Sequence, residues 1–337
     1  MIKNQIAQIL RHNGTYPVRE VLFLFTLAGV LFFSSLSYAF WLWSPSSGKW
    51  ENPKYPPIKE NAQKQFEFAK QLFEKGDYQR ARDEFKRLLK RYPDSVYAYK
   101  GEFLLGKVYE SLKRPYLAFQ TYKDCVANYP YGDQLEDIAE RECRIGEFFL
   151  EQEVRKVLGL ELSLPQEKAI EIFKEIRKQA PYTEWGALAQ YKLGICYQRL
   201  KKWKEAIAEF NRFINEYPEH SKVVSGDANY QIALSYSESI LNADYDQKRT
   251  AKAIKYFKDF VIDYPQNEKI KDAKEKIVRL EERVAEGLFK SASFYRQQGY
   301  TESARTYYNE IIDKYGETSW ARKAEEELEK INQMSNI

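Results

Sequence analysis

The chain has 337 residues, 44% of them hydrophobic and 30% charged, which is enough apolar material for a large folded body. Its 15 Gly and 12 Pro exclude collagen-like and low-complexity classes. A formal net charge of only +4 argues against nucleic acid as the main partner.

The N-terminal residues 1–39 have the three-part layout of a secretory signal peptide. Basic residues precede an uncharged apolar run at 21–33, and small and polar residues follow up to Ala39. The alternative is an uncleaved anchor at 21–43, because a stretch of about 20 uncharged residues suffices to cross a bilayer. In both cases the flanking positive charge stays in the cytoplasm, so we expect the rest of the chain to be exported.

Residues 40–60 contain four Pro and three Trp and show no helical period. This composition predicts an extended linker. Tryptophan is enriched where a membrane meets water, because its ring is apolar while its N–H stays hydrated. We therefore predict a membrane-interface contact at Trp41 and Trp43. The alternative is that these rings pack on the first repeat.

From residue 61 onwards one spacing pattern recurs in six copies. A small residue is followed by a larger apolar residue, then by Ala, an aromatic residue and a closing Pro, at offsets of three, nine, four and eight. Four copies have this spacing: Ala69, Leu72, Ala81, Phe85 and Pro93; Gly106, Tyr109, Ala118, Tyr122 and Pro130; Gly194, Tyr197, Ala206, Phe210 and Pro218; and Ala292, Tyr295, Ala304 and Tyr308, with Gly316 in place of Pro. Two copies have extra residues in the middle: Gly146, Phe149, Ala169, Phe173 and Pro181; and Ala233, Tyr236, Ala253, Phe257 and Pro265.

This spacing is typical of two helices that cross closely. Small residues allow the approach, aromatic residues fill the space beside them, and Pro ends the second helix. One such pair cannot bury its own apolar face, so neighbouring pairs must stack on it. The pattern resembles the tetratricopeptide repeat. We predict an all-α fold, an α-solenoid of about six tetratricopeptide-type helix pairs.

We assign N-terminal repeats one to three to 61–181, and repeats four to six with a capping helix to 182–337. The insertion at 154–164 is expected to extend the first helix of its repeat and then form a loop, with Pro165 beginning the next helix. The Pro-free stretch 267–298 predicts one long helix leading into the sixth repeat.

The sequence contains no pattern typical of catalysis or metal binding. The three cysteines, Cys125, Cys143 and Cys196, lie beside apolar residues in repeat helices, which predicts buried free thiols and leaves a bond between the first two open. Only His12 and His220 are present, and no phosphate-binding glycine loop or nucleophile elbow occurs. We predict no enzyme, no cofactor, no metal and no small-molecule substrate.

The C-terminal half, from Thr183 to Ala324, resembles the BamD family, the periplasmic tetratricopeptide component of the outer-membrane β-barrel assembly machinery. The likeness is strongest over 272–324, which contains the run A-x-x-Y-x-x-x-G-x-x-x-x-A. Two features depart from the family. Well-studied members carry a lipidated Cys after the signal, whereas the first Cys here is Cys125, and many members have an Arg where this chain has Tyr307.

The resemblance implies a non-enzymatic scaffold at the periplasmic face of the outer membrane. Its expected partners are a barrel-assembly subunit similar to BamA and unfolded segments of outer-membrane proteins. Two alternatives stay open: a periplasmic tetratricopeptide scaffold for envelope or cell-division machinery, and a regulator of a cell-wall enzyme. An inner-membrane anchor with periplasmic repeats is the alternative location.

The first helices of tetratricopeptide pairs line the concave side of the solenoid, which places a candidate peptide-binding groove there. Its rings would hold an aromatic side chain, and its lysines the terminal carboxylate of an outer-membrane protein segment. The alternative is that Phe66 and Phe103 pack between adjacent repeats. The candidate residues are Phe66, Lys70, Phe73, Lys100, Phe103 and Lys107.

Overall fold

A computed structural model describes residues 42–44, 49–51, 59–153, 156–157, 160–161, 165–240 and 247–335. The chain divides into two compact units, Met1–Glu60 and Asn61–Ile337. The predicted signal peptide or anchor, and with it Trp41, lies outside the described residues. Among the helices that are described, none has both the length and the apolar character that a membrane crossing requires.

In the first unit the described residues form a short antiparallel hairpin. Strand β1 (Leu42–Ser44) pairs with β2 (Lys49–Glu51), and Trp43 lies opposite Trp50 in the register. We expected an extended linker here. The described residues instead form two paired antiparallel strands.

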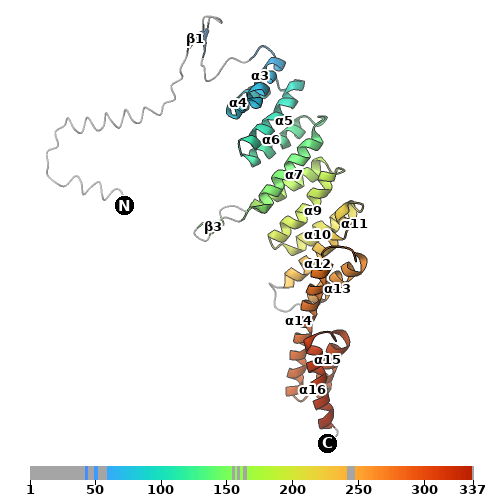
Figure 1. The fold of residues 1–337 in the computed structure, drawn as a ribbon. Coiled ribbons are helices and arrows are strands. Elements are labelled where there is room, and N and C mark those ends of the chain that lie inside the picture. Colours follow the sequence, from blue (N-terminus) through green and yellow to red (C-terminus); the bar gives the residue numbers. More distant parts are fainter. Residues whose placement is uncertain are drawn as a thin grey trace, which may run out of the picture. The chain divides into compact units, whose positions relative to one another are not determined.

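The described residues of the second unit form helices and one small hairpin (Figure 1). Its helices are α3 (Ala62–Glu74), α4 (Tyr78–Arg91), α5 (Val96–Ser111), α6 (Pro115–Asn128), α7 (Leu135–Glu151), α8 (Pro165–Gln179), α9 (Glu184–Arg199), α10 (Trp203–Glu216), α11 (Ser221–Val224), α12 (Asp227–Ile240), α13 (Gln247–Asp263), α14 (Ile270–Gln297), α15 (Thr301–Lys314) and α16 (Ser319–Ser335). The pairs are α3/α4, α5/α6, α7/α8, α9/α10, α12/α13 and α14/α15, so the predicted all-α solenoid is confirmed.

The small residues hold the two helices of a pair together as the spacing predicted. A Cβ atom added to Gly106 would lie 2.2 Å from the Tyr122 ring, and one added to Gly194 would lie 2.5 Å from the Phe210 ring. Such distances leave no room for a side chain. The contact between a small residue and the aromatic residue of its partner helix therefore repeats from pair to pair.

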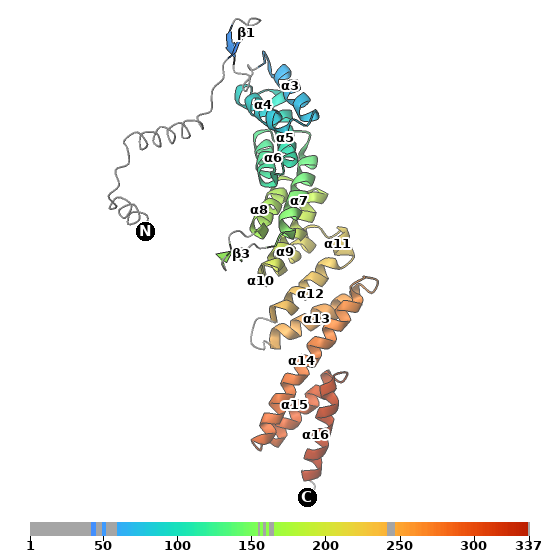
Figure 2. The ribbon, with the colours of Figure 1, turned by 60° about the vertical axis from the view of Figure 1, so that its left-hand side comes forward.

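Each pair buries its outer face against the next pair. One buried cluster runs from Phe66 to Cys196, a second from Ala187 to Ile232 and a third from Tyr230 to Ile331, so consecutive clusters overlap along the chain. In Figures 1 and 2 consecutive pairs lie side by side in both views. This nearest-neighbour packing is how repeat proteins obtain a core from elements that have none alone.

Of two segments that we expected to be helical, one is not and the other is. Helix α7 ends at Glu151, and the insertion that follows contains a second hairpin, β3 (Lys156–Val157) with β4 (Leu160–Glu161), in place of the expected helical extension. Pro165 begins α8 as predicted. The expected long helix is confirmed as α14, whose 28 residues pack against both α13 and α15.

Candidate functional site

Two of the predicted peptide-binding rings lie in the core, so our placement of them on an open face was wrong. Phe66 is 7% exposed and Phe103 is 5% exposed. The Phe66 ring centroid lies 5.6 Å from that of Tyr97 on the next pair, and the Phe103 centroid lies 6.0 Å from that of Tyr122. The cause is that α5 lies between α4 and α6 and buries residues on more than one face.

The other four candidates keep accessible surface on the adjoining helices α3 and α5. Lys100 is exposed, and Lys70 forms only an exposed ion pair of 3.7 Å with Glu74. Lys107 is half-buried with its Nζ atom 5.4 Å above the Phe103 ring, and Phe73 is half-buried beside Tyr78. Three lysines and one partly covered ring thus keep accessible surface on two adjoining helices. Trp43, which we predict to contact a membrane interface, lies on β1, in the other unit.

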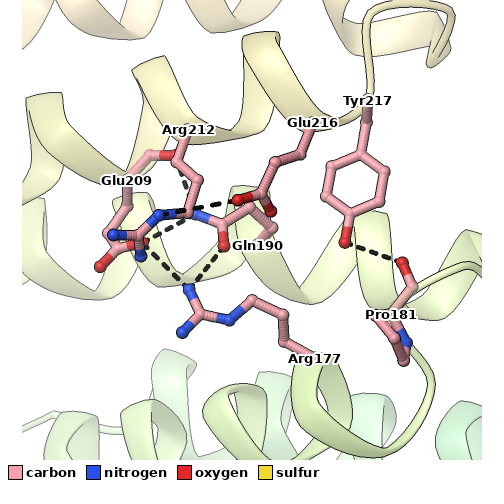
Figure 3. Close-up of polar contacts among 7 residues, drawn as sticks. All are labelled: Arg177, Pro181, Gln190, Glu209, Arg212, Glu216 and Tyr217. Atoms are coloured by element: carbon pink, nitrogen blue, oxygen red, sulfur yellow. Dashed lines mark hydrogen bonds and ion pairs between the residues drawn. The ribbon is translucent and has the colours of Figure 1, made fainter.

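The sequence reasoning missed a polar network that joins the third pair to the fourth. Gln190 of α9 is fully buried, and its Nε2 atom donates to the backbone carbonyl of Glu209 at 2.9 Å and to its carboxylate at 2.8 Å. From α8, Arg177 donates to the Gln190 amide oxygen at 2.7 Å (Figure 3). Arg212 donates to the same Glu209 carboxylate at 2.9 Å. Three helices are thereby joined through one buried amide.

The first pair has the same arrangement. Gln65 donates to the backbone carbonyl of Glu84 at 3.1 Å and to its carboxylate at 2.7 Å, and Arg87 contacts that carboxylate at 3.1 Å. The sequence signal was present: a Gln stands four residues before the small residue, and a Glu one residue before the aromatic residue. Because both buried amide nitrogens are bonded to a backbone carbonyl and to a carboxylate, we interpret these networks as structural.

The third pair carries Glu142 at the position of Gln65 and Gln190. Its side chain is fully buried, and within the described residues neither carboxylate oxygen has a hydrogen-bond partner. Burial, and then the nearby carboxylate of Glu175, raise the pKa of Glu142 well above its ordinary value. Burial at this position therefore favours the neutral form of the carboxyl group.

The described residues contain neither a reactive cysteine nor a metal-binding group of side chains. Burial raises the pKa of each thiol, Cys125, Cys143 and Cys196, to about 12, so all three remain protonated. The prediction of buried free thiols is confirmed. Among the described residues, no group of three or more His, Cys, Asp or Glu side chains could hold a metal ion.

Two family models match the sequence. The model YfiO, described as outer membrane lipoprotein, matches residues 164–336, a little over half of the chain. A tetratricopeptide repeat model matches residues 66–133. The tetratricopeptide repeat match covers the first two helix pairs. The YfiO match begins next to α8 and ends with α16.

Two curated relatives share the name outer membrane protein assembly factor BamD. The chain is 29% identical over 157 residues to that of Caulobacter vibrioides, an alignment that covers 47% of this chain and 51% of the relative. It is 28% identical over 151 residues to that of Rickettsia prowazekii, covering 45% of this chain and 59% of the relative. The chain thus spans somewhat more than half the length of the curated relatives it matches.

Solved structures of repeat proteins are also similar. A crystal structure of MamA protein gives a TM-score of 0.35 at 22% identity, over 62% of this chain and 94% of that chain. The structure of YrrB, a tetratricopeptide repeat protein, gives 0.36 at 16% identity, over 64% of this chain and 93% of that chain.

Proposed function

The chain belongs to the YfiO family of outer membrane lipoproteins, and from this premise we propose that it is a scaffold of the machinery that assembles outer-membrane β-barrel proteins. The family match over residues 164–336 is the observation that carries the proposal. Membership supports a location at the periplasmic face of the outer membrane and a role in assembly that involves no catalysis.

Two regions of the solenoid would have different tasks. The repeats within 182–337 fall inside the family match and would hold a barrel-assembly subunit similar to BamA. The repeats within 61–181 lie mostly outside that match and would receive unfolded segments of outer-membrane proteins. This division follows the limits of the family match.

The N-terminal surface proposed for these segments consists of Lys70, Lys100 and Lys107 with the exposed part of Phe73. A barrel segment that ends in an aromatic residue and a carboxylate would place its charge among the lysines and its ring beside Phe73. Phe66 and Phe103 are both buried, so they would pack beneath this surface.

Attachment to the membrane is proposed to involve the hairpin unit. Trp41 and Trp43 are the residues suited to a membrane interface. The three cysteines are buried within helices of the second unit, so none of them is a site for acylation in the folded protein.

The test is co-purification of the full chain with the barrel-assembly subunit, together with titration of a barrel-derived C-terminal peptide. Capture of the subunit by the wild type supports the scaffold role. Its absence would favour a scaffold for other envelope machinery. For the peptide, Lys70→Ala with Lys107→Ala should weaken binding, whereas Lys75→Ala with Lys90→Ala, two exposed lysines of the first pair, is the matched control.

A further inference from the structure

A cavity of about 490 Å³ opens between the fourth and fifth helix pairs. It is formed by the turn from α9 to α10, the first turns of α10, the end of α12 and the first turns of α13. Five cationic side chains and one carboxylate line it: Lys201, Lys202, Lys204, Arg249, Lys252 and Glu205. The cavity is therefore strongly positive, although the chain as a whole carries a net charge of only +4.

The lysines of this cavity differ from those lining another cavity further along the chain. There, between α13, α14 and α15, Lys255 pairs with Asp259 and Lys258 with Glu281, both at 2.7 Å. In contrast, Lys201, Lys202 and Lys204 have no ion pair with any described residue. Like charges that outnumber the counter-charges on a concave surface create a field that attracts anions.

The beginning of α10 adds to this field. Lys202 is the N-cap residue of α10 and provides no side-chain hydrogen bond to the first turn. In the first pair the equivalent residue is Asp77, whose carboxylate accepts from the backbone N–H of Arg80 at 3.3 Å. The cavity thus contains a lysine where the first pair uses a carboxylate, and an external carboxylate would supply that interaction.

The rest of the wall is apolar. Trp203, Ile207 and Tyr236 line the cavity and are all half-buried. The Tyr236 ring is fixed by stacking on Tyr256, with 4.9 Å between centroids and 14° between planes. A small inorganic anion would use the charge but leave this wall uncovered. The fitting ligand has carboxylates and an apolar side chain next to one another.

We propose that this cavity binds a short acidic segment of a partner protein, in which carboxylates flank an aromatic or aliphatic side chain. Four of the five cations are lysines, which act as separate point charges and suit carboxylates spread along a peptide. The site is distinct from the N-terminal surface assigned to unfolded barrel segments. It does not require the barrel-assembly role, so the two proposals can fail independently.

The test is a titration of the full chain with the fluorescent peptide Asp-Glu-Phe-Glu-Asp, followed by anisotropy. Two further peptides replace the acids by Asn and Gln, or the Phe by Ser. We expect binding of the first peptide that weakens with salt and falls at least tenfold when its charge is removed. Asp244 and Asp246 follow α12 in the sequence and lie outside the described residues. Because the full chain is titrated, the measured affinity of the peptide includes the effect of these two carboxylates.

The decisive variant is Lys202→Glu with Lys204→Glu, which should reduce the affinity at least tenfold. Its matched control, Lys271→Glu with Lys274→Glu, changes the net charge equally at exposed positions of α14 and should stay within twofold of wild type. Lys252→Gln tests the opposite wall, and thermal melts establish that each variant is folded. Trp203→Ala should weaken the Phe peptide more than the Ser peptide.

Equal loss of affinity in the cavity variant and in its control would overturn the proposal. So would displacement of the peptide by inorganic phosphate, or by vesicles of anionic phospholipid, at concentrations below the peptide's own dissociation constant. Retention of the barrel-assembly subunit by the cavity variant would leave the scaffold role intact.

Discussion

The hydroxyl of Tyr217 donates a hydrogen bond to the backbone carbonyl of Pro181, 2.8 Å away (Figure 3). Tyr217 precedes the closing Pro218 of the fourth repeat, and Pro181 is the closing Pro of the third. Tyr129 and Pro93 make the same 2.8 Å bond between the second repeat and the first. The closing residues therefore also connect one repeat to its neighbour.

Replacing Tyr217 by Phe should lower the free energy of unfolding by about 0.5–1.5 kcal/mol, because the ring stays and one hydrogen bond is lost. Urea denaturation measures the change. Tyr182→Phe is the control, since Tyr182 is 99% exposed, and we expect it to stay within about 0.5 kcal/mol of wild type. Equal effects of the two substitutions would contradict the role of the bond.

Ala206→Leu should destabilise the fold by about 1–3 kcal/mol through overpacking. Ala206 has no exposed surface, and its helix crosses α9 closely beside the contact of Gly194 with Phe210. Thermal melts of Ala206→Leu and of Ala208→Leu, an exposed position on the same helix, provide the comparison. An unchanged melting temperature for the buried variant would show that the phase of the repeat is wrong.

Glu142→Gln should stabilise the protein at neutral pH by about 1–3 kcal/mol. Because the pKa of Glu142 is raised in the folded state, its contribution is fully present below the unfolded pKa near 4.5 and is lost as the pH rises towards the folded pKa. A glutamine keeps the neutral form at every pH, as Gln65 and Gln190 do in their repeats. The stability of the variant should therefore decline less than that of wild type as the pH rises above the unfolded pKa.

The control is Glu136→Gln, an exposed position in the first turn of the same helix, with an expected change of at most about 0.5 kcal/mol. Denaturation midpoints across the pH range measure both variants. A Glu142→Gln profile parallel to that of wild type would show that this carboxyl is not the group that titrates.

The three cysteines should resist thiol-specific reagents in the folded protein at pH 8. Their pKa values of about 12 leave almost no thiolate at that pH, and their side chains are buried. Ellman's reagent should report three thiols only after denaturation. Rapid reaction of one thiol in the native protein would indicate local opening of its repeat.

The repeat phase could be predicted because it depends on residues whose size alone dictates the contact, such as Gly194 against Phe210. The burial of Phe66 and Phe103 could not be predicted from one apolar stripe. A helix inside a stack contacts its partner and the preceding pair, so two faces are buried at once. The polar network of Gln190 was also missed, because an isolated Gln in a helix has the same sequence signal whether it is buried or solvated.

The cationic cavity could not be predicted from the sequence for a different reason. Lys201, Lys202 and Lys204 read as an ordinary charged turn, and only packing of the fifth pair turns this segment into a concave wall. The peptide-binding lysines Lys70, Lys100 and Lys107 stay a prediction, since the structure gives their positions and no ligand contact.

Helix α14 makes the fifth and sixth pairs mechanically continuous. Its 28 residues correspond to a rod of about 42 Å at 1.5 Å per residue. One half of the rod packs on α13 and the other on α15, with no loop between them that could act as a joint. A force applied to the last pair is therefore transmitted through α14 to the fifth pair. There, α13 forms one wall of the cationic cavity.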